Sequence, residues 1–341
     1  MGSERSAPLR WGATAVNGGF VRIAMTGMGG ELGTRVASLL ESDPRIDAIL
    51  GLDCDPPRRR LQRAKFAICD PRDRDAVVRA ITDFEPTAML HLGVYEPNAR
   101  ASARAAIERT RQGARYALGA AAECPTVDRF IIRSGIEVYG RSTSHAARPD
   151  ESRETRPTSQ FGEVLAEVEQ ISRNAAATRG ASLTILRFAP IVGPHFPSPL
   201  GRYLRLPVVP IPPMAELPFA LIHQEDAAAA IVRAVTVAPD AAVNVAAPGA
   251  VTPYQAVRLG GRVPVPVVGP AWVVARAISA VLGSPVPDHV VELLRRGRVA
   301  DGSAVSDLLD WQPTRSTIEV VTELFEWASV VYLRDGEEVA A

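Results

Sequence analysis

Residues 21–33 read VRIAMTGMGGELG, and this stretch decides the fold. Its first six residues form an apolar run typical of a buried strand, and a pattern of helical period follows it. Gly27, Gly30 and Gly33 lie at the turn expected between the two. In a turn that binds a dinucleotide, the first glycine allows the tight bend. The second admits a pyrophosphate, and the third lets helix and strand pack closely. The spacing therefore predicts a dinucleotide-binding turn.

Strand-like and helix-like segments alternate from this turn to about residue 190. Strands are expected at 48–53, 66–70, 87–93, 129–134 and 182–188, with helices at 31–41, 76–81, 101–122 and 161–177. Alternation of this kind is typical of βαβ units with right-handed crossovers. The predicted fold class is α/β, a Rossmann-type doubly wound parallel sheet with a smaller, interleaved C-terminal cap.

The composition of the chain changes beyond residue 190. Prolines are frequent in the stretch 190–218 and break long elements into short ones. Four parts are expected: a disordered leader over 1–19, a dinucleotide-binding Rossmann domain over 20–190, a cap over 191–331 and a tail over 332–341. The cap is expected to interleave with the last sheet elements at about 219–247, which hold a helix at 226–237 and a strand at 243–246. Asp226 is expected to cap that helix.

An acidic residue follows the glycine turn at the spacing that ribose binding needs. Asp53 ends the second predicted strand, 20 residues beyond Gly33. Its carboxylate would accept hydrogen bonds from ribose hydroxyls and repel a 2′-phosphate, which predicts NAD as the cofactor. Three consecutive arginines at 58–60 could reverse that preference, so NADP is the alternative.

The composition excludes several classes of function. The 341 residues carry 38 basic and 38 acidic side chains, so no net field favours a nucleic acid, and none is expected as a partner. No run of 18 apolar residues predicts a membrane span. The three cysteines are scattered and suggest a reducing, cytoplasmic location. The five histidines show no metal-ligand spacing, so no metal is expected.

Further motifs give the chain a family resemblance. They are HLG at 91–93, RSGIEVYG at 133–140, RFAPIVGP at 187–194, FALIHQEDAAAAI at 219–231 and LLDWQPTRSTIEVVTELFEWA at 308–328. Together with TGMGGELG at 26–33, their order resembles the extended short-chain dehydrogenase/reductases. Within these, the chain looks like the NAD-dependent epimerase/dehydratase family, in its UDP-glucose 4-epimerase-like branch. The resemblance covers about residues 21–328.

The resemblance implies a cofactor site, a substrate and an assembly. The residues it assigns to NAD are Gly27, Met28, Gly30, Leu32, Gly33, Asp53, Asp70, Leu92 and Gly93. Among these, Asp70 resembles the acid that meets the adenine. The resemblance also implies a small-molecule substrate, and a homodimer formed through the helices at 101–122 and 161–177.

The chain departs from the family where the family's chemistry takes place. That chemistry needs a Tyr and a Lys four residues apart on one helix, together with a Ser or Thr. Phe161 stands at the tyrosine, Leu165 at the lysine and Gly135 at the Ser/Thr position. Lys65 is the only lysine in the chain, so a shift of register restores no pair.

The family's contacts to sugar nucleotides are also replaced. Pro190 stands at an asparagine position and Phe219 at an arginine position. The cap is rich in apolar residues, namely Val208, Val209, Ile211, Met214, Leu217 and Phe219. These residues are either core or the lining of a pocket. If they line a pocket, the substrate is less charged than a sugar nucleotide.

Three functional hypotheses remain, and whether the chain is an enzyme stays open. The first is an NAD(H)-binding member of the family whose catalysis is atypical or lost. The second is an active epimerase, dehydratase or dehydrogenase on a sugar or lipophilic substrate, with Ser134 and Tyr139 doing the proton work. Glu137, His145 and His223 are further residues near the expected site. The third is a redox-sensing or scaffolding module that binds NAD(H).

Overall fold

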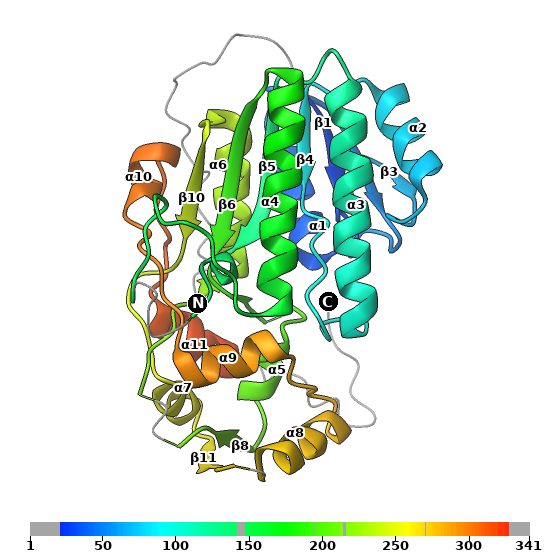
Figure 1. Ribbon diagram of the computed structural model, residues 1–341. Coiled ribbons are helices and arrows are strands. Elements are labelled where there is room, and N and C mark those ends of the chain that lie inside the picture. The colour runs from blue at the N-terminus through cyan, green and yellow to red at the C-terminus, as the bar shows by residue number, and fades with distance from the viewer. Residues whose placement is uncertain (1–20, 142–146, 195, 214–215, 270, 327–341) are drawn as a thin grey trace, which may run out of the picture.

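A computed structural model describes residues 21–141, 147–194, 196–213, 216–269 and 271–326 (Figure 1). Its centre is a parallel sheet of seven strands in the order β10-β6-β5-β4-β1-β2-β3. These strands are β1 (Val21–Thr26), β2 (Ile46–Asp53), β3 (Lys65–Ile68), β4 (Ala88–His91), β5 (Arg129–Gly135), β6 (Ser182–Phe188) and β10 (Ala241–Val245). The predicted fold class is confirmed.

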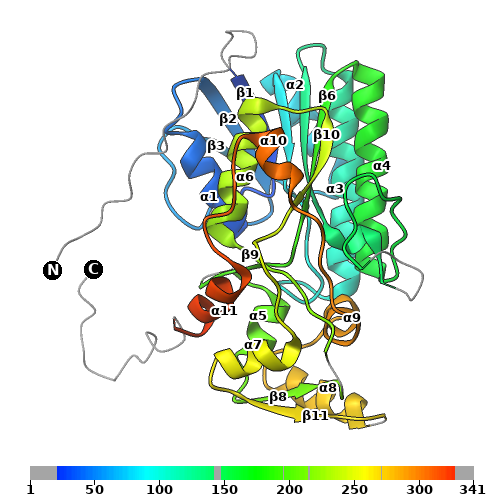
Figure 2. The same cartoon turned by 90° about the vertical axis from the view of Figure 1, so that its left-hand side faces the viewer.

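Helices cover both faces of the sheet, which gives three layers (Figure 2). One face carries α1 (Glu31–Leu40) and α6 (Gln224–Val237), which contact each other. The other face carries α2 (Arg74–Phe84), α3 (Ala103–Glu123) and α4 (Gln160–Arg179), packed side by side in that order. Between β5 and α4 the chain makes a single 3₁₀ turn, η1 (Ile136–Tyr139).

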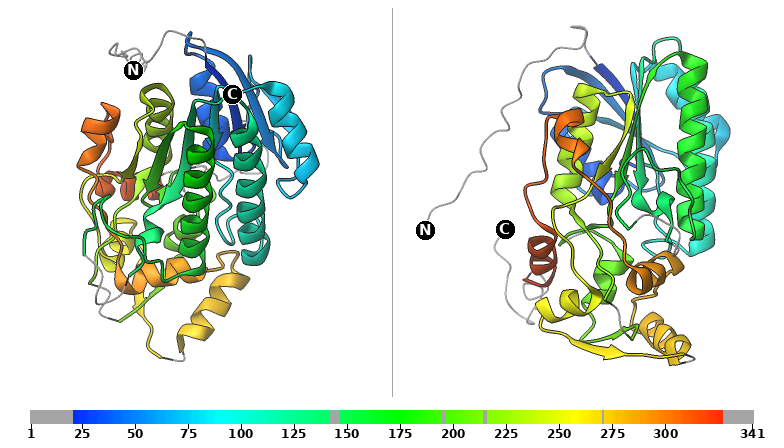
Figure 3. Two further views of the ribbon diagram at one scale, coloured as in Figure 1. Left: turned by 45° about the horizontal axis from the view of Figure 1, so that its top comes forward. Right: turned by 60° about the vertical axis from the view of Figure 1, so that its left-hand side comes forward.

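The cap gathers short elements at one end of the sheet (Figure 3). Its strands are β7 (Ile191–Val192) paired with β9 (Ile222–His223), and β8 (Val208–Ile211) paired with β11 (Val263–Pro266). Its helices are α5 (Pro199–Leu204), α7 (Pro253–Leu259), α8 (Ala271–Val281), α9 (Asp288–Arg296) and α11 (Thr317–Glu326). A further helix, α10 (Ala304–Leu309), contacts β10 and α6 beside the sheet.

The strand order places a crevice beside β1. From β1 the chain builds β2 and β3 on one side and then returns to add β4 on the other. The loops that leave the carboxyl ends of β1 and β4 therefore diverge, and ligands of doubly wound sheets bind at such a switch point. The residues that follow β1, β2, β4 and β5 therefore lie at the end of the sheet where such a ligand binds.

One predicted helix cap is wrong. The N-cap of α6 is His223, whose Nδ1 accepts from the Glu225 amide at 3.3 Å. Asp226 lies inside the first turn, and its carboxylate accepts instead from the backbone of Thr314 and Arg315. The carboxylate thereby ties a distant segment to the helix, a long-range contact that local spacing does not encode.

Some predictions fall outside the described residues. These are the leader over 1–19, the tail over 332–341, the end of the last helix beyond 326, and the candidates His145 and Met214. The proposed domain boundaries stay predictions. Among the described helices, none is long and apolar enough to cross a membrane.

Candidate functional site

Two glycines of the β1–α1 turn are required by close contacts. Gly27 has φ +77°, and a Cβ there would lie 2.7 Å from the Leu92 carbonyl carbon. A Cβ at Gly33 would lie 2.0 Å from the Gly27 carbonyl oxygen. The first position therefore allows the turn, and the second lets α1 pack against it.

Gly30 differs, because it keeps the end of α1 open. It is the N-cap of α1 and offers no side-chain cap, and a Cβ there would meet only the Gly27 carbonyl oxygen at 3.4 Å. The amides of the first helical turn therefore have no side-chain acceptor at the cap position. Such amides, with the positive end of the helix dipole, favour an anion.

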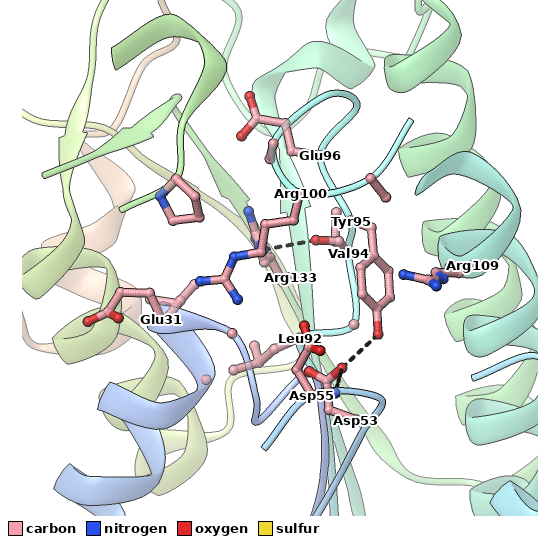
Figure 4. Close-up of a pocket in the computed structure, with 18 of the residues that line it drawn as sticks. Glu31, Asp53, Asp55, Leu92, Val94, Tyr95, Glu96, Arg100, Arg109 and Arg133 are labelled. Carbon is pink, nitrogen blue, oxygen red and sulfur yellow. Dashed lines mark hydrogen bonds between the residues drawn. The ribbon is translucent and has the colours of Figure 1, made fainter. Parts of the chain in front are cut away.

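This helix end borders a cavity of about 250 Å³ at the carboxyl ends of β1, β2, β4 and β5 (Figure 4). The predicted cofactor residues among its lining are Gly27, Gly30, Leu32, Gly33, Asp53, Leu92 and Gly93. We call this space the first cavity. The structure therefore brings seven of the nine residues predicted to bind a cofactor to one place.

Asp53 lies at the floor of the first cavity and is buried (Figure 4). Its Oδ2 accepts from the Gly29 amide at 3.0 Å, and its Oδ1 accepts from the Tyr95 hydroxyl at 3.1 Å. Burial, reinforced by the Asp53 charge, raises the pKa of Tyr95 and keeps the phenol protonated as a donor. The predicted ribose ligand thus already holds the glycine loop and a tyrosine in place.

The other two predicted cofactor residues lie elsewhere. The Met28 side chain is fully buried and packs against Gly51 of β2. A Cβ built on Gly51 would lie 2.1 Å from the Met28 sulfur. Asp70 is not among the residues that line the first cavity. It pairs with Arg72 at 2.6 Å, and this hydrogen bond lowers the pKa of Asp70 to about 2.

Three arginines of the first cavity were not found from the sequence. Arg100 and Arg133 line it from the loop after β4 and from β5, and burial lowers the pKa of both guanidinium groups. Arg133 donates to the Val94 carbonyl at 3.1 Å, and Arg109 lies 5.9 Å from the Tyr95 ring centroid (Figure 4). An Arg-rich chain gave no signal that singled them out.

A smaller cavity of about 40 Å³ adjoins the first. Phe161, Leu165, Ser134 and Gly135 line it, so the positions expected from the family resemblance do come together. Phe161 and Leu165 are buried and apolar. Val94, Glu96 and Arg133 line both cavities and form their common wall. We call this space the second cavity.

The hydroxyls of Ser134 and Tyr139 already have partners within the protein. Ser134 donates to Glu169 at 2.7 Å. The Tyr139 hydroxyl accepts from Arg187 and contacts the Asn244 side-chain oxygen, both at 2.8 Å. Burial raises the pKa of Tyr139 although Arg187 is close. Tyr139 is absent from the lining of either cavity.

The apolar cap residues take different places. Val209, Ile211 and Phe219 are buried in the core, whereas Val208 and Leu217 are exposed. None of these five lines the first or second cavity. Within the described residues, no group of three or more His, Cys, Asp or Glu side chains could hold a metal ion.

The sequence comparisons identify a family and several relatives. The model of the NAD dependent epimerase/dehydratase family matches residues 23–209, more than half of the chain. Uncharacterized proteins of Mycobacterium tuberculosis and Mycobacterium bovis are each 28% identical over 333 residues. The alignments cover 93% of this chain and 86% of each relative.

Solved structures share the fold. UDP-glucose 4-epimerase of Thermotoga maritima with UDP-glucose has a TM-score of 0.70 at 19% identity, covering 90% of this chain and 98% of that one. UDP-glucuronic acid 4-epimerase of Bacillus cereus in complex with NAD has a TM-score of 0.69 at 16% identity, covering 91% and 99%. WbmG of Bordetella bronchiseptica in complex with NAD has a TM-score of 0.69 at 18% identity, covering 92% and 95%.

Proposed function

Because the chain belongs to the NAD dependent epimerase/dehydratase family, we propose that it binds NAD(H) in the first cavity and lacks the family's Tyr–Lys chemistry. The observation that carries the first half is the open N-terminus of α1 at Gly30, facing a cavity that also contains Asp53. The observation that carries the second is the burial of Phe161 and Leu165 beside the second cavity.

The residues present fit a dinucleotide. The amides of the first turn of α1 would hold the diphosphate, and the nearby Arg100 would offset its charge. Asp53 would hold the adenosine ribose, since a carboxylate accepts about four hydrogen bonds and its Oδ2 uses only the Gly29 amide. With the diphosphate at α1, the reacting end would point toward the common wall with the second cavity, to which Glu96 belongs. When bound, the nicotinamide supplies a hydride acceptor or donor.

Phe161 and Leu165, which replace the family's tyrosine and lysine, cannot transfer a proton to or from a substrate. Phe161 has no hydroxyl to donate and Leu165 has no charge to lower the pKa of a neighbour. Loss of positioned acid–base help costs about 10²–10⁴ in rate. Catalysis is therefore atypical or absent. The walls that Leu200 and Leu293 add to the second cavity favour an apolar substrate over a sugar nucleotide.

Thermal unfolding with NAD, NADH, NADP and NADPH tests cofactor binding. A ligand that binds only the folded state at 100 times its Kd adds about 2.7 kcal/mol of stability, enough to raise Tm by several degrees. We expect a shift with NAD or NADH. A shift only with the phosphorylated pair would assign the site to NADP and the arginines at 58–60. No shift with any of the four would contradict the proposal.

The alternative assignment of catalysis to Ser134 and Tyr139 makes its own prediction. Since both hydroxyls are held in a buried network, we expect Tyr139→Phe to leave any turnover unchanged while it lowers stability. Turnover and urea unfolding of the same sample separate the two effects. If turnover were lost with NAD binding intact, Tyr139 would be the acid–base group.

A further inference from the structure

An imidazole lies against the ring at the position where the family resemblance expects a tyrosine. His289, in the first turn of α9, is only 5% exposed and lines the second cavity. Its ring centroid lies 4.8 Å from that of Phe161, and its Nε2 lies 3.2 Å from Glu96 Oε1. A carboxylate oxygen facing a ring nitrogen accepts from it, so in the neutral imidazole Nε2 carries the proton and Nδ1 has the lone pair. The contact with Glu96 thus prepares His289 to accept a proton.

A carboxylate fills the space beside residue 135. Glu137 is 5% exposed, and a Cβ built on Gly135 would lie 2.3 Å from its Oε2. Its other oxygen pairs with Arg298 Nη1 at 3.2 Å, and Arg298 is fully buried. The absence of a side chain at 135 therefore lets Glu137 turn back toward the second cavity, which it lines.

The second cavity matches one polar group. Its volume of about 40 Å³ exceeds the roughly 10–15 Å³ that one enclosed water molecule needs, so it admits a small polar group. Glu96, Glu137, His289 and Arg133 contribute polar atoms, and the remaining walls are largely apolar. This arrangement suits a hydroxyl or carbonyl group carried on an apolar molecule.

We propose that His289 is the acid–base residue of this protein and that the Arg133 guanidinium, which lines the same cavity, donates to the reacting oxygen. The substrate class is a secondary alcohol or the matching ketone. The alcohol's O–H proton passes to His289 Nδ1 and its C–H hydrogen leaves as hydride, so that the C–O bond becomes a carbonyl. The hydride acceptor is a nicotinamide dinucleotide, and in this respect the inference rests on the proposed function. Glu96 is a positioning residue that fixes the imidazole.

The smallest secondary alcohol provides the activity test. 2-Propanol with NAD, and acetone with NADH, are followed at 340 nm, while NADH fluorescence reports binding. We expect His289→Asn to lower kcat by about a hundredfold or more with NADH binding kept. His223→Asn is the matched control, because His223 is equally buried, lies outside both cavities, and asparagine is itself a good helix cap.

The outcomes separate the two proposals. If NADH does not bind, the proposed function fails. If NADH binds but the wild-type chain turns over neither probe, or if His289→Asn and His289→Gln both match it, the acid–base assignment is overturned. Melting curves of each variant show whether it folds, and His289→Gln keeps a hydrogen-bond donor for Glu96.

A second readout needs no turnover. The ¹⁵N chemical shifts of histidine side chains report which ring nitrogen carries the proton, and His289→Gln assigns the signal. We expect the Nε2–H tautomer in the wild-type chain and a mixture of tautomers in Glu96→Leu. An Nδ1–H tautomer in the wild-type chain would contradict the proposal, because the lone pair would then face Glu96.

Discussion

At residue 135 the lack of a side chain has a structural purpose beyond backbone freedom. The space that a Cβ would fill holds the carboxylate of Glu137, and Leu165 lies 3.2 Å from the same point. The residue at this position therefore decides which polar group reaches the second cavity. The side chains allowed at positions 135 and 137 therefore depend on each other, although neither residue is marked by its local sequence.

Gly135→Ala tests this coupling. We expect it to lower the free energy of unfolding by about 1–3 kcal/mol, because the added methyl must displace a buried carboxylate. Gly119→Ala is the control, since Gly119 is exposed on α3 with nothing within 4 Å of a built Cβ. That change should stabilise the chain by about 0.5–1 kcal/mol. Urea unfolding measures the free energy of unfolding of both variants. Equal values for Gly135→Ala and the wild-type chain would refute the coupling.

His91 makes the stability depend on pH. Complete burial lowers its pKa to about 4, against about 6.5 in an unfolded chain. Between these values the unfolded state binds a proton that the folded state does not. The contribution of His91 to the free energy of unfolding is therefore complete above pH 6.5 and is lost as the pH falls toward 4. From pH 7 to pH 5 the loss is about 2 kcal/mol.

His91→Gln provides the comparison, because glutamine stays neutral throughout. Urea unfolding at pH 7 and pH 5 should show the wild-type chain losing about 2 kcal/mol more than the variant. Other groups contribute to both proteins and cancel in the difference. An equal loss in the two proteins would mean that His91 is not the buried neutral group described.

Local sequence pattern predicts single residues only where the site is local. The glycine turn and Asp53 belong to one βαβ unit, and their spacing in the sequence identifies them. Glu96 and His289 are 193 residues apart, and nothing near either one marks the other. Tyr95 and Arg133 also act through contacts that only the folded chain creates.

At the scale of elements, one buried network joins β5, α4 and β6. Glu169 of α4 is fully buried, and its two oxygens accept from Arg187 of β6 at 2.8–2.9 Å. Ser134 of β5 donates to the same carboxylate. The network holds β5 and α4, the two elements that carry Gly135 and Phe161, in fixed relation.

Glu169→Ala should therefore cost about 3–5 kcal/mol, because it leaves the buried Arg187 charge without its partner. Glu167→Ala, on the same helix, removes partly exposed pairs with Arg111 and Arg115 and should cost at most about 1 kcal/mol. The free energy of unfolding in urea measures both. Similar costs for the two variants would show that burial does not distinguish these pairs.

Apolar runs in the sequence predict strands of the central sheet closely. Hydrophobic alternation predicts β1 and β6 with the bounds that the structure has. Of the apolar stripe Val164, Leu165, Val168 and Ile171 on α4, the first three are buried within the protein itself and Ile171 is half-buried. It therefore gives no support to the homodimer, which stays a prediction.

At the scale of the whole molecule, two cavities share a wall built from the loop after β4 and the end of β5. Residues of cap helix α9 and of α4 line the second cavity, and the glycine turn lines the first. The chain returns from the cap to add α6 and β10 to the sheet body. Sequence order could predict the sheet, but it could not show that residues near 289 complete a site begun near 96.

The central claim is that the open N-terminus of α1 binds a dinucleotide, and calorimetric titration of NAD into Gly30→Asp tests it most directly. Gly30 has extended backbone angles, φ −71° and ψ 161°, so aspartate fits there as an N-cap and preserves stability. Its carboxylate takes the free amides and repels the diphosphate. We predict binding to the wild-type chain and to the charge-matched Gly119→Asp, and at least a tenfold weaker Kd, about 1.4 kcal/mol, for Gly30→Asp. Equal affinity of all three proteins would contradict the account.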